Sequence, residues 1–175
     1  MIVPTHDYGT PRFSFLSLSD FPTGYAYIAA SLKKAGHEVH GLNLNNIIGY
    51  TSKFMMISNK IGKALFDIKP DLIGMGGLCI DYKFLKDAMG IIRNLSPKTP
   101  VVMGGGIINH DYEFIFNLLK PDFCIIGEAE ETIVKLADML KSGNKDWESI
   151  DNLGYWCEED SVVSTAQKNK NKCVE

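Results

Sequence analysis

The sequence predicts an α/β fold: a doubly wound, flavodoxin-like (Rossmann-like) domain with a five-stranded parallel sheet, three α/β/α layers and a small C-terminal β-hairpin. First, short apolar segments alternate with amphipathic segments of helical length, the order typical of parallel sheets with crossover helices. Second, the segments at 72–76, 101–103 and 123–126 carry no charge, as expected for strands covered on both faces. Third, each of these three segments runs into glycine at its carboxyl end.

The elements follow in a regular order. The expected strands span residues 1–5, 38–44, 71–76, 101–103 and 122–126, and the expected helices span 25–35, about 52–67, 83–94, about 112–119 and 130–141. Residues 6–19 are polar, aromatic and interrupted by glycine and proline, which predicts a long loop, and such loops in compact domains are often functional. We expect the flavodoxin-like strand order, with the switch point between the first and third strands.

The pattern changes after Gly143, where residues 150–164 predict a hairpin that turns at 159–161. We therefore expect a ligand-binding Rossmann-like domain over residues 1–145, a β-hairpin extension of the same domain over 146–165, and a tail or linker over 166–175.

The composition of the chain excludes some classes of binding partner. A net charge of −3 and a pI near 5.8 argue against nucleic acid and against an anionic membrane surface. No apolar run approaches the roughly 20 residues that a membrane-spanning helix needs. Because the chain opens on a strand-like segment without a basic and then apolar signal, we expect a cytoplasmic protein.

Cysteine and histidine show no metal-binding pattern. The four cysteines are far apart and lack zinc-site spacing. Cys79 and Cys124 follow or end strands, so we expect both to pack as small apolar groups. His37 and His40 lie where the chain turns into a strand, so their side chains are expected to face opposite sides. We predict no metal ligand.

Open α/β sheets bind ligands at the carboxyl ends of their strands, but the usual nucleotide fingerprints are missing. No Gly-x-Gly-x-x-Gly follows the first strand, no acidic residue closes the second, and no Gly-x-x-x-x-Gly-Lys-Ser/Thr occurs. A flavodoxin-like nucleotide- or flavin-binding domain, or a ligand-free assembly domain, stays as an alternative, because hydroxyl side chains scattered over 14–23 leave a phosphate loop open.

A set of segments resembles one family. Residues 22–39, Pro-Thr-Gly-Tyr-Ala-Tyr-Ile-Ala-Ala-Ser-Leu-Lys-Lys-Ala-Gly-His-Glu-Val, are similar to the first helix of the cobalamin-binding domain at the front of many radical S-adenosylmethionine enzymes. Pro-Asp-Leu-Ile-Gly at 70–74, Val-Val-Met-Gly-Gly-Gly at 101–106, Gly-Glu-Ala-Glu-Glu-Thr at 127–132 and Ile-Asp-Asn-Leu-Gly-Tyr at 150–155 follow in the family's order and spacing. The resemblance covers about residues 1–165.

The resemblance implies that the corrin ring of cobalamin lies over the carboxyl ends of the strands and that its nucleotide tail runs into the sheet. Members whose histidine ligates cobalt carry Asp-x-His-x-x-Gly after the first strand. Here Ser-Asp-Phe-Pro-Thr-Gly at 19–24 takes that place, and the phenyl group of Phe21 cannot coordinate a metal. The resemblance therefore implies base-off cobalamin without a ligating histidine.

The expected cofactor-binding residues gather at the carboxyl ends of the strands, and none is expected to be catalytic. They are Phe21, Thr23, Gly24, Gly74, Met75, Gly76, Gly77, Leu78, Met103, Gly104, Gly105, Gly106, Gly127 and Glu128. As a test, Gly76→Trp and Gly105→Trp are each expected to abolish cobalamin uptake while the fold persists, because a large side chain would fill the ring's seat.

The chain lacks Cys-x-x-x-Cys-x-x-Cys, the spacing that holds the iron–sulfur cluster of radical enzymes. The resemblance thus implies a cobalamin-binding module, the N-terminal part of a radical S-adenosylmethionine protein, with methyl transfer as the expected reaction. The cluster and S-adenosylmethionine would belong to a catalytic domain absent from this chain, supplied in cis or in trans. Whether the chain alone is an enzyme stays open.

Overall fold

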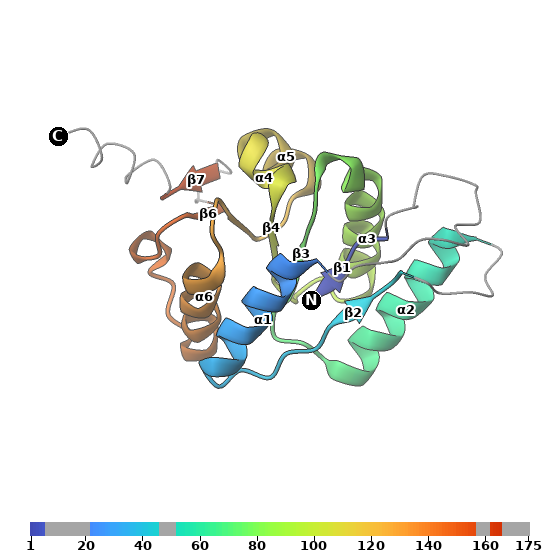
Figure 1. Ribbon diagram of the computed structural model, residues 1–175, viewed down its shortest axis with the longest axis horizontal. Coiled ribbons are helices and arrows are strands. Elements are labelled where there is room, and N and C mark those ends of the chain that lie inside the picture. The colour runs from blue at the N-terminus through green and yellow to red at the C-terminus, as the bar shows by residue number, and fades with distance from the viewer. Residues whose placement is uncertain (6–21, 46–51, 157–161, 166–175) are drawn as a thin grey trace.

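The computed structural model describes residues 1–5, 22–45, 52–156 and 162–165. Its centre is one seven-stranded sheet with the order β2-β1-β3-β4-β5-β6-β7 (Figure 1). The strands are β1 (Ile2–Val3), β2 (Leu42–Asn43), β3 (Ile73–Gly76), β4 (Val101–Gly104), β5 (Phe123–Ile125), β6 (Leu153–Trp156) and β7 (Val162–Ser164). The first five are mutually parallel, and β6 and β7 are antiparallel to their neighbours.

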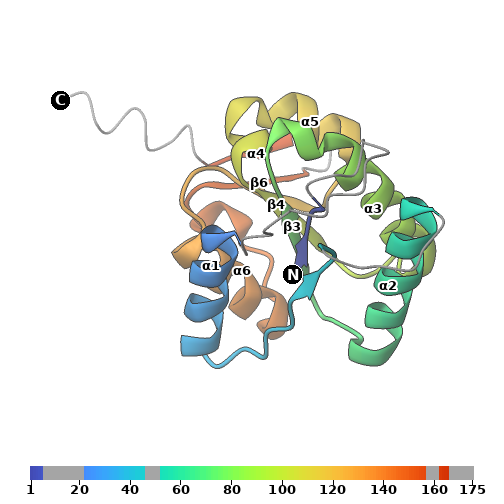
Figure 2. The same cartoon turned by 45° about the vertical axis from the view of Figure 1, so that its right-hand side comes forward.

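Helices cover both faces of this sheet (Figures 1 and 2). One face carries α1 (Thr23–Lys34) and α6 (Glu130–Ser142), which lie side by side. The other face carries α2 (Lys53–Ile68), α3 (Tyr82–Leu95), α4 (Gly106–His110) and α5 (Tyr112–Leu119), and two single 3-10 turns occur at Cys79–Asp81 and Trp147–Ser149. The three-layer α/β/α prediction is confirmed.

The strand order β2-β1-β3-β4-β5 confirms the flavodoxin-like topology and its switch point between β1 and β3. The expected five-stranded sheet has seven strands, because the C-terminal hairpin pairs with β5 and so extends the sheet. The predicted turn of the hairpin, at 159–161, lies outside the described residues.

The first two strands are shorter than predicted. Their sequence alternation extends over 1–5 and 38–44, but only Ile2–Val3 pairs with Leu42–Asn43. The short helix α4 was not predicted. It begins directly at Gly106, after two further glycines, and a segment of five residues is too short to carry a helical periodicity that sequence alone could reveal.

Two apolar cores flank the sheet. The larger packs α2, α3, α4 and α5 against side chains such as Met75, Met103 and Cys124. The smaller packs α1 and α6 against Val102 and Ile125 on the opposite face. Successive residues of a strand point to opposite faces, so Gly74, which pairs with Val102, belongs to the α1–α6 side.

Candidate functional site

Hydrogen bonds join the loops at the carboxyl edge of the sheet to one another. The Ile107 amide donates to the Gly77 carbonyl oxygen at 3.0 Å, which fixes the start of α4 on the loop after β3. The Gly127 amide donates to the Asn109 side-chain oxygen at 2.8 Å, which ties α4 to the loop after β5. These bonds make the loops after β3, β4 and β5 one connected rim.

Some glycines of this rim are needed by the backbone. A Cβ on Gly76 would fall on the Gly104 carbonyl oxygen, since these residues are paired across β3 and β4. Gly105 has φ +86° and ψ −173°, a conformation that is almost restricted to glycine, and its Cβ would lie 3.0 Å from the Gly77 carbonyl oxygen. The predicted tests Gly76→Trp and Gly105→Trp are therefore wrong in assuming that the fold persists.

Other glycines leave open space. A Cβ on Gly104 would meet only the Ile125 carbonyl oxygen, at 3.8 Å, and one on Gly74 would meet Met1 Cγ at 3.6 Å and Val102 Cγ1 at 3.9 Å. These are ordinary van der Waals distances, so neither position needs glycine for backbone packing. Gly74 and Gly104 instead leave the α1–α6 face of the sheet without side chains at these two positions.

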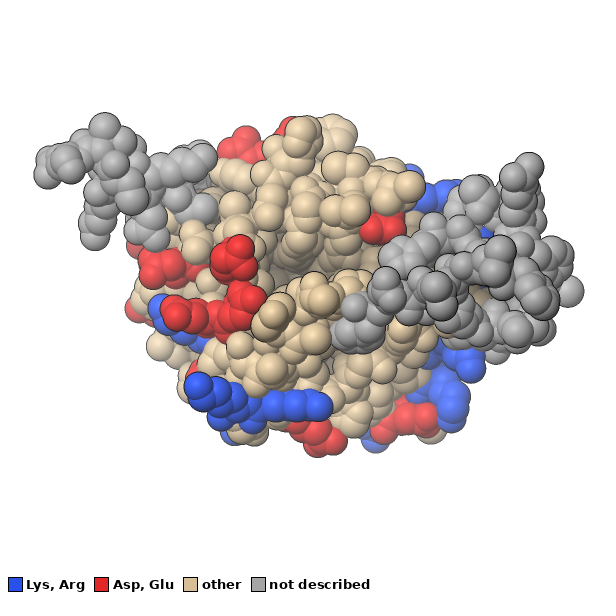
Figure 3. Space-filling view, in the orientation of Figure 1, with Lys and Arg blue, Asp and Glu red and all other residues tan. Residues whose placement is uncertain are grey.

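A cavity of about 1290 Å³ occupies this bare region, and we call it the α1–α6 cavity. It runs from the glycine loops at the carboxyl edge, past α1 and α6, to Val39, Leu72 and Leu140 near the opposite edge of the sheet, and it also reaches α2 at Ile61 and Leu65. Figure 3 shows uncharged surface around the middle of this face, with the charged side chains farther out. The cavity exceeds the roughly 300–1,000 Å³ typical of small-molecule sites, so it suits a large ligand.

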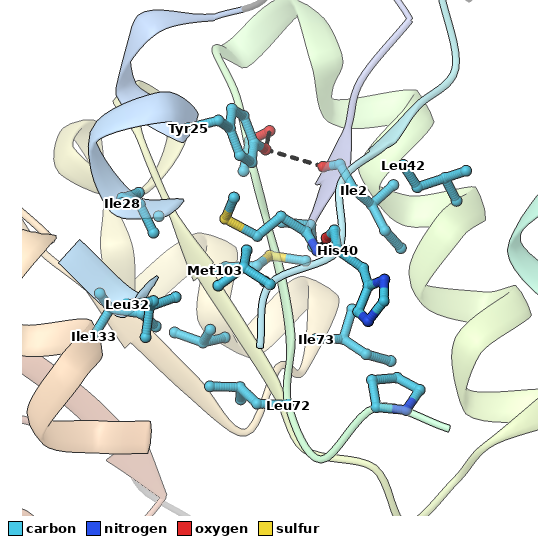
Figure 4. A pocket seen from close by; sticks show the side chains of 18 of the residues that line it. Ile2, Tyr25, Ile28, Leu32, His40, Leu42, Leu72, Ile73, Met103 and Ile133 are labelled. Carbon is cyan, nitrogen blue, oxygen red and sulfur yellow. Dashed lines mark hydrogen bonds between the residues drawn. The ribbon is translucent and has the colours of Figure 1, made fainter. Parts of the chain in front are cut away.

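One face of α1 forms a wall of the cavity. Tyr25, Ile28 and Leu32 follow each other at helical spacing and line the cavity, and Figure 4 shows Tyr25 pointing toward Ile2. The Tyr25 hydroxyl lies 2.8 Å from the Gly76 carbonyl oxygen and 3.1 Å from that of Ile2, so it anchors α1 to β3 and β1.

The Tyr25 hydroxyl stays a neutral hydrogen-bond donor. Burial raises the pKa of Tyr25, and the nearby Asp81 carboxylate raises it further. Asp81 itself accepts a hydrogen bond from the Leu78 amide at 2.9 Å and so shapes the loop after β3. Tyr25 and Asp81 therefore set the mouth of the cavity at the carboxyl edge.

Most of the predicted binding residues line this cavity. They are Gly24, Gly74, Met75, Gly76, Gly77, Leu78, Met103, Gly104, Gly105 and Gly106. Met75 and Met103 are buried, and their side chains also belong to the core on the α2–α5 side, whereas Leu78 is 62% exposed at the rim.

The remaining predicted residues lie apart from the cavity or outside the described chain. Thr23 is exposed in the first turn of α1, and Gly127 and Glu128 are exposed in the loop after β5. Phe21 lies outside the described residues. The assignment of all these residues to cofactor binding stays a prediction.

Sequence reasoning missed Tyr25, Asp81 and Asn109. Tyr25 was detectable, because it shares a helical face with Ile28 and Leu32. Asp81 and Asn109 gave no such signal, since their roles depend on loops that only the fold brings together.

The cysteine prediction is half right. Cys124 is buried, but Cys79 is exposed at the rim, because it follows the end of β3 and enters a 3-10 turn.

His37 Nε2 lies 3.1 Å from an Asp138 oxygen, and His40 Nε2 lies 2.8 Å from a Glu38 oxygen. Within the described ranges no cluster of three metal-ligating side chains occurs. No helix in these ranges has the length and apolarity to cross a bilayer.

Comparison with known structures gives the same fold. A radical S-adenosylmethionine methyltransferase, TsrM from Kitasatospora setae, solved with cobalamin and a [4Fe-4S] cluster, superposes with a TM-score of 0.71 at 18% identity over 94% of this chain and 28% of that one. OxsB, a cobalamin-dependent S-adenosylmethionine radical enzyme solved with aqua-cobalamin, gives 0.65 at 16% identity over 93% and 21%. This chain thus spans less than a third of either protein. No match was found among curated protein sequences.

The family comparison is independent of these superpositions. The model of the B12 binding domain matches residues 20–137, a range that holds α1, the glycine loops and most of the residues that line the α1–α6 cavity. The chain belongs to the B12-binding domain family.

Proposed function

We propose that this chain holds cobalamin, with the nucleotide tail in the α1–α6 cavity and the corrin ring over the carboxyl edge of the sheet. The observation that carries the proposal is the continuous cavity from the glycine loops along the sheet beneath α1 and α6. A long, flat cofactor needs such a bare path, and Gly74 and Gly104 leave it unfilled. Family membership favours this ligand over a flavin or another nucleotide.

We further propose that cobalt is held base-off and without a protein histidine. Support comes from Phe21, which stands where a ligating histidine would be. It also comes from His37 and His40, which precede β2 and so lie at the edge of the sheet opposite to the proposed seat of the corrin ring. Gly24, Gly74 and Gly104 would hold the cofactor by leaving room for it, and Leu78 would give apolar cover at the rim.

The proposed role is that of a module in a larger protein. TsrM and OxsB carry their remaining length beyond the part that this chain matches, and this chain lacks the iron–sulfur cysteine motif. We therefore propose a radical S-adenosylmethionine partner domain in cis or in trans, with methyl transfer as its reaction. When bound, cobalamin supplies the cobalt that carries the methyl group, and the protein binds and orients it.

The test is direct binding. Purified chain is mixed with hydroxocobalamin, free ligand is removed by gel filtration, and the visible spectrum of the protein fraction is recorded. Retained cobalamin with a base-off spectrum is expected. A spectrum of histidine-ligated cobalamin would overturn the assignment of Phe21. No retained cobalamin in a folded sample would overturn the proposed function itself.

A further inference from the structure

The α1–α6 cavity is apolar in its middle and polar only toward its two ends. Its middle is lined from three directions by α1, α6 and the sheet, through Ile28, Leu32, Leu72, Gly74, Val102 and Ile133. The polar lining side chains that the structure describes lie elsewhere. Tyr25 and Asp81 are at the carboxyl mouth. The Met1 amino group, which donates to the His40 carbonyl oxygen, lies toward the opposite edge, as do the side chains that precede β2, precede β3 or end α6: His37, Glu38, His40, Lys69, Asp71 and Lys141.

The polar groups nearest the middle are already engaged. The Tyr25 hydroxyl is held by the Gly76 and Ile2 carbonyl oxygens, and Asp81 accepts from the Leu78 amide. His37 Nε2, at the far end, lies 3.1 Å from an Asp138 oxygen but makes no hydrogen bond to the residues that the structure describes. A group placed in the cavity beside Leu32 and Val102 therefore meets hydrocarbon.

From this lining we infer that the chain selects among cobamides by their lower base, preferring benzimidazolyl and phenolyl bases to purines. The inference rests on the proposed function, because it requires the nucleotide tail to enter the cavity. Adenine carries an exocyclic amine and ring nitrogens that bond to water outside the protein. Inside an apolar site those groups lose their partners, and a buried polar group without a partner lowers affinity.

The expected selectivity is moderate. Discrimination by an apolar pocket against one added polar group reaches about a hundredfold at most, so we expect cobalamin to bind about ten- to a hundredfold more tightly than adeninylcobamide. A p-cresolyl base has no ring nitrogen and is expected to bind at least as well as dimethylbenzimidazole. Gly74 puts no side chain of its own between Leu72 and Val102, where Met1 Cγ and Val102 Cγ1 approach its position, which leaves room for a flat ring beside them.

The experiment compares four corrinoids on the purified chain: hydroxocobalamin, p-cresolylcobamide, adeninylcobamide and cobinamide, which has no nucleotide tail. Dissociation constants are measured by equilibrium dialysis and visible absorbance. We expect cobalamin and p-cresolylcobamide to bind tightly, and adeninylcobamide and cobinamide to bind at least about tenfold more weakly.

The four corrinoids distinguish a failure of the proposed function from a failure of the inferred base selectivity. If no corrinoid binds to folded protein, the proposed function fails and the inference with it. If cobinamide binds as tightly as cobalamin, a corrinoid site exists but the tail does not use the cavity. If adeninylcobamide equals cobalamin while cobinamide is weak, the tail enters but the base selection is wrong.

A pair of variants on α1 sharpens the result. Ile28→Gln places an amide in the cavity wall, where it can bond to a purine, so the cobalamin preference is expected to shrink several-fold. Tyr27→Gln is the matched control, because Tyr27 is 65% exposed and is not among the lining residues that the structure describes. An unchanged preference in folded Ile28→Gln, or an equal change in Tyr27→Gln, would overturn the placement of the base beside Ile28.

Discussion

The two faces of the sheet are covered by helices in different ways. On the α2–α5 side, large side chains such as Phe84, Phe116 and Ile57 are completely buried and fill the space between helices and strands. On the α1–α6 side, the strands carry glycine at positions 74, 76 and 104, where larger side chains would fill the space beneath the helices, and a cavity results. Both faces carry an apolar core, but the α1–α6 side also leaves open space along the strands, and the proposed function places cobalamin there.

The largest expected effect lies on the packed face. Phe84→Ala deletes a fully buried ring from α3 and should lower the free energy of unfolding by about 3–5 kcal/mol. Ile28→Ala should cost about 1 kcal/mol or less, because the side chain already borders open space. Urea denaturation of both variants compares the two faces, and equal losses would contradict the distinction.

The next effect separates the two kinds of glycine. Gly105→Ala should lower the free energy of unfolding by about 1–3 kcal/mol or more, because φ of +86° is strained for alanine and Gly77 blocks its Cβ. Gly104→Ala should change it by no more than about 0.5–1 kcal/mol, since its Cβ has room. Thermal unfolding of the two neighbouring variants checks this, and a Gly104→Ala that unfolds as readily as Gly105→Ala would refute it.

A smaller and local effect concerns the two described cysteines. Burial raises the pKa of the Cys124 thiol to about 12, so below that pH it stays protonated and unreactive. Cys79 is exposed at the rim, and at about pH 8 iodoacetamide should label it at least about tenfold faster than Cys124. Peptide mass spectrometry of the native protein measures both rates. Equal labelling would show that the α2–α5 core opens.

Bound cobalamin should slow the labelling of Cys79, because the proposed seat of the corrin ring lies beside Leu78 and the rim. Labelling with and without hydroxocobalamin provides the comparison. An unchanged rate at saturating ligand would place the corrin ring away from this loop.

Much of the fold was predictable because it depends on local pattern. Alternating apolar and amphipathic segments identified the five parallel strands and the helices between them, and the order of the strands followed from crossover rules. The limits of β1 and β2 were not predictable, because they depend on which residues find a partner across the sheet. The helix α4 escaped because Gly106 begins it.

The position of the candidate site at the carboxyl edge was predictable, but the cavity behind that edge was not. The glycines at the strand ends indicated the carboxyl edge, and ten of the predicted residues line the cavity. Sequence could not separate Gly74 from Gly76, since the difference lies in what faces each missing Cβ across the β3–β4 pairing. The cavity itself arises from the position of α1 and α6 over the sheet, which is a property of the assembled fold.

The central claim is that the bare α1–α6 face binds cobalamin, and one substitution tests it most directly. Gly74→Leu puts a side chain into the cavity, whereas Gly90→Leu, the matched control, adds the same side chain at an exposed site on α3 with nothing within 4 Å. Thermal unfolding establishes that both variants are folded, and Gly104→Leu serves as a second cavity variant.

Hydroxocobalamin binding is then measured for wild type and each variant. We expect wild type and Gly90→Leu to bind alike, and Gly74→Leu to lose at least about tenfold in affinity, because a leucine side chain occupies space that the tail needs. A folded Gly74→Leu that binds hydroxocobalamin as tightly as wild type would contradict the claim.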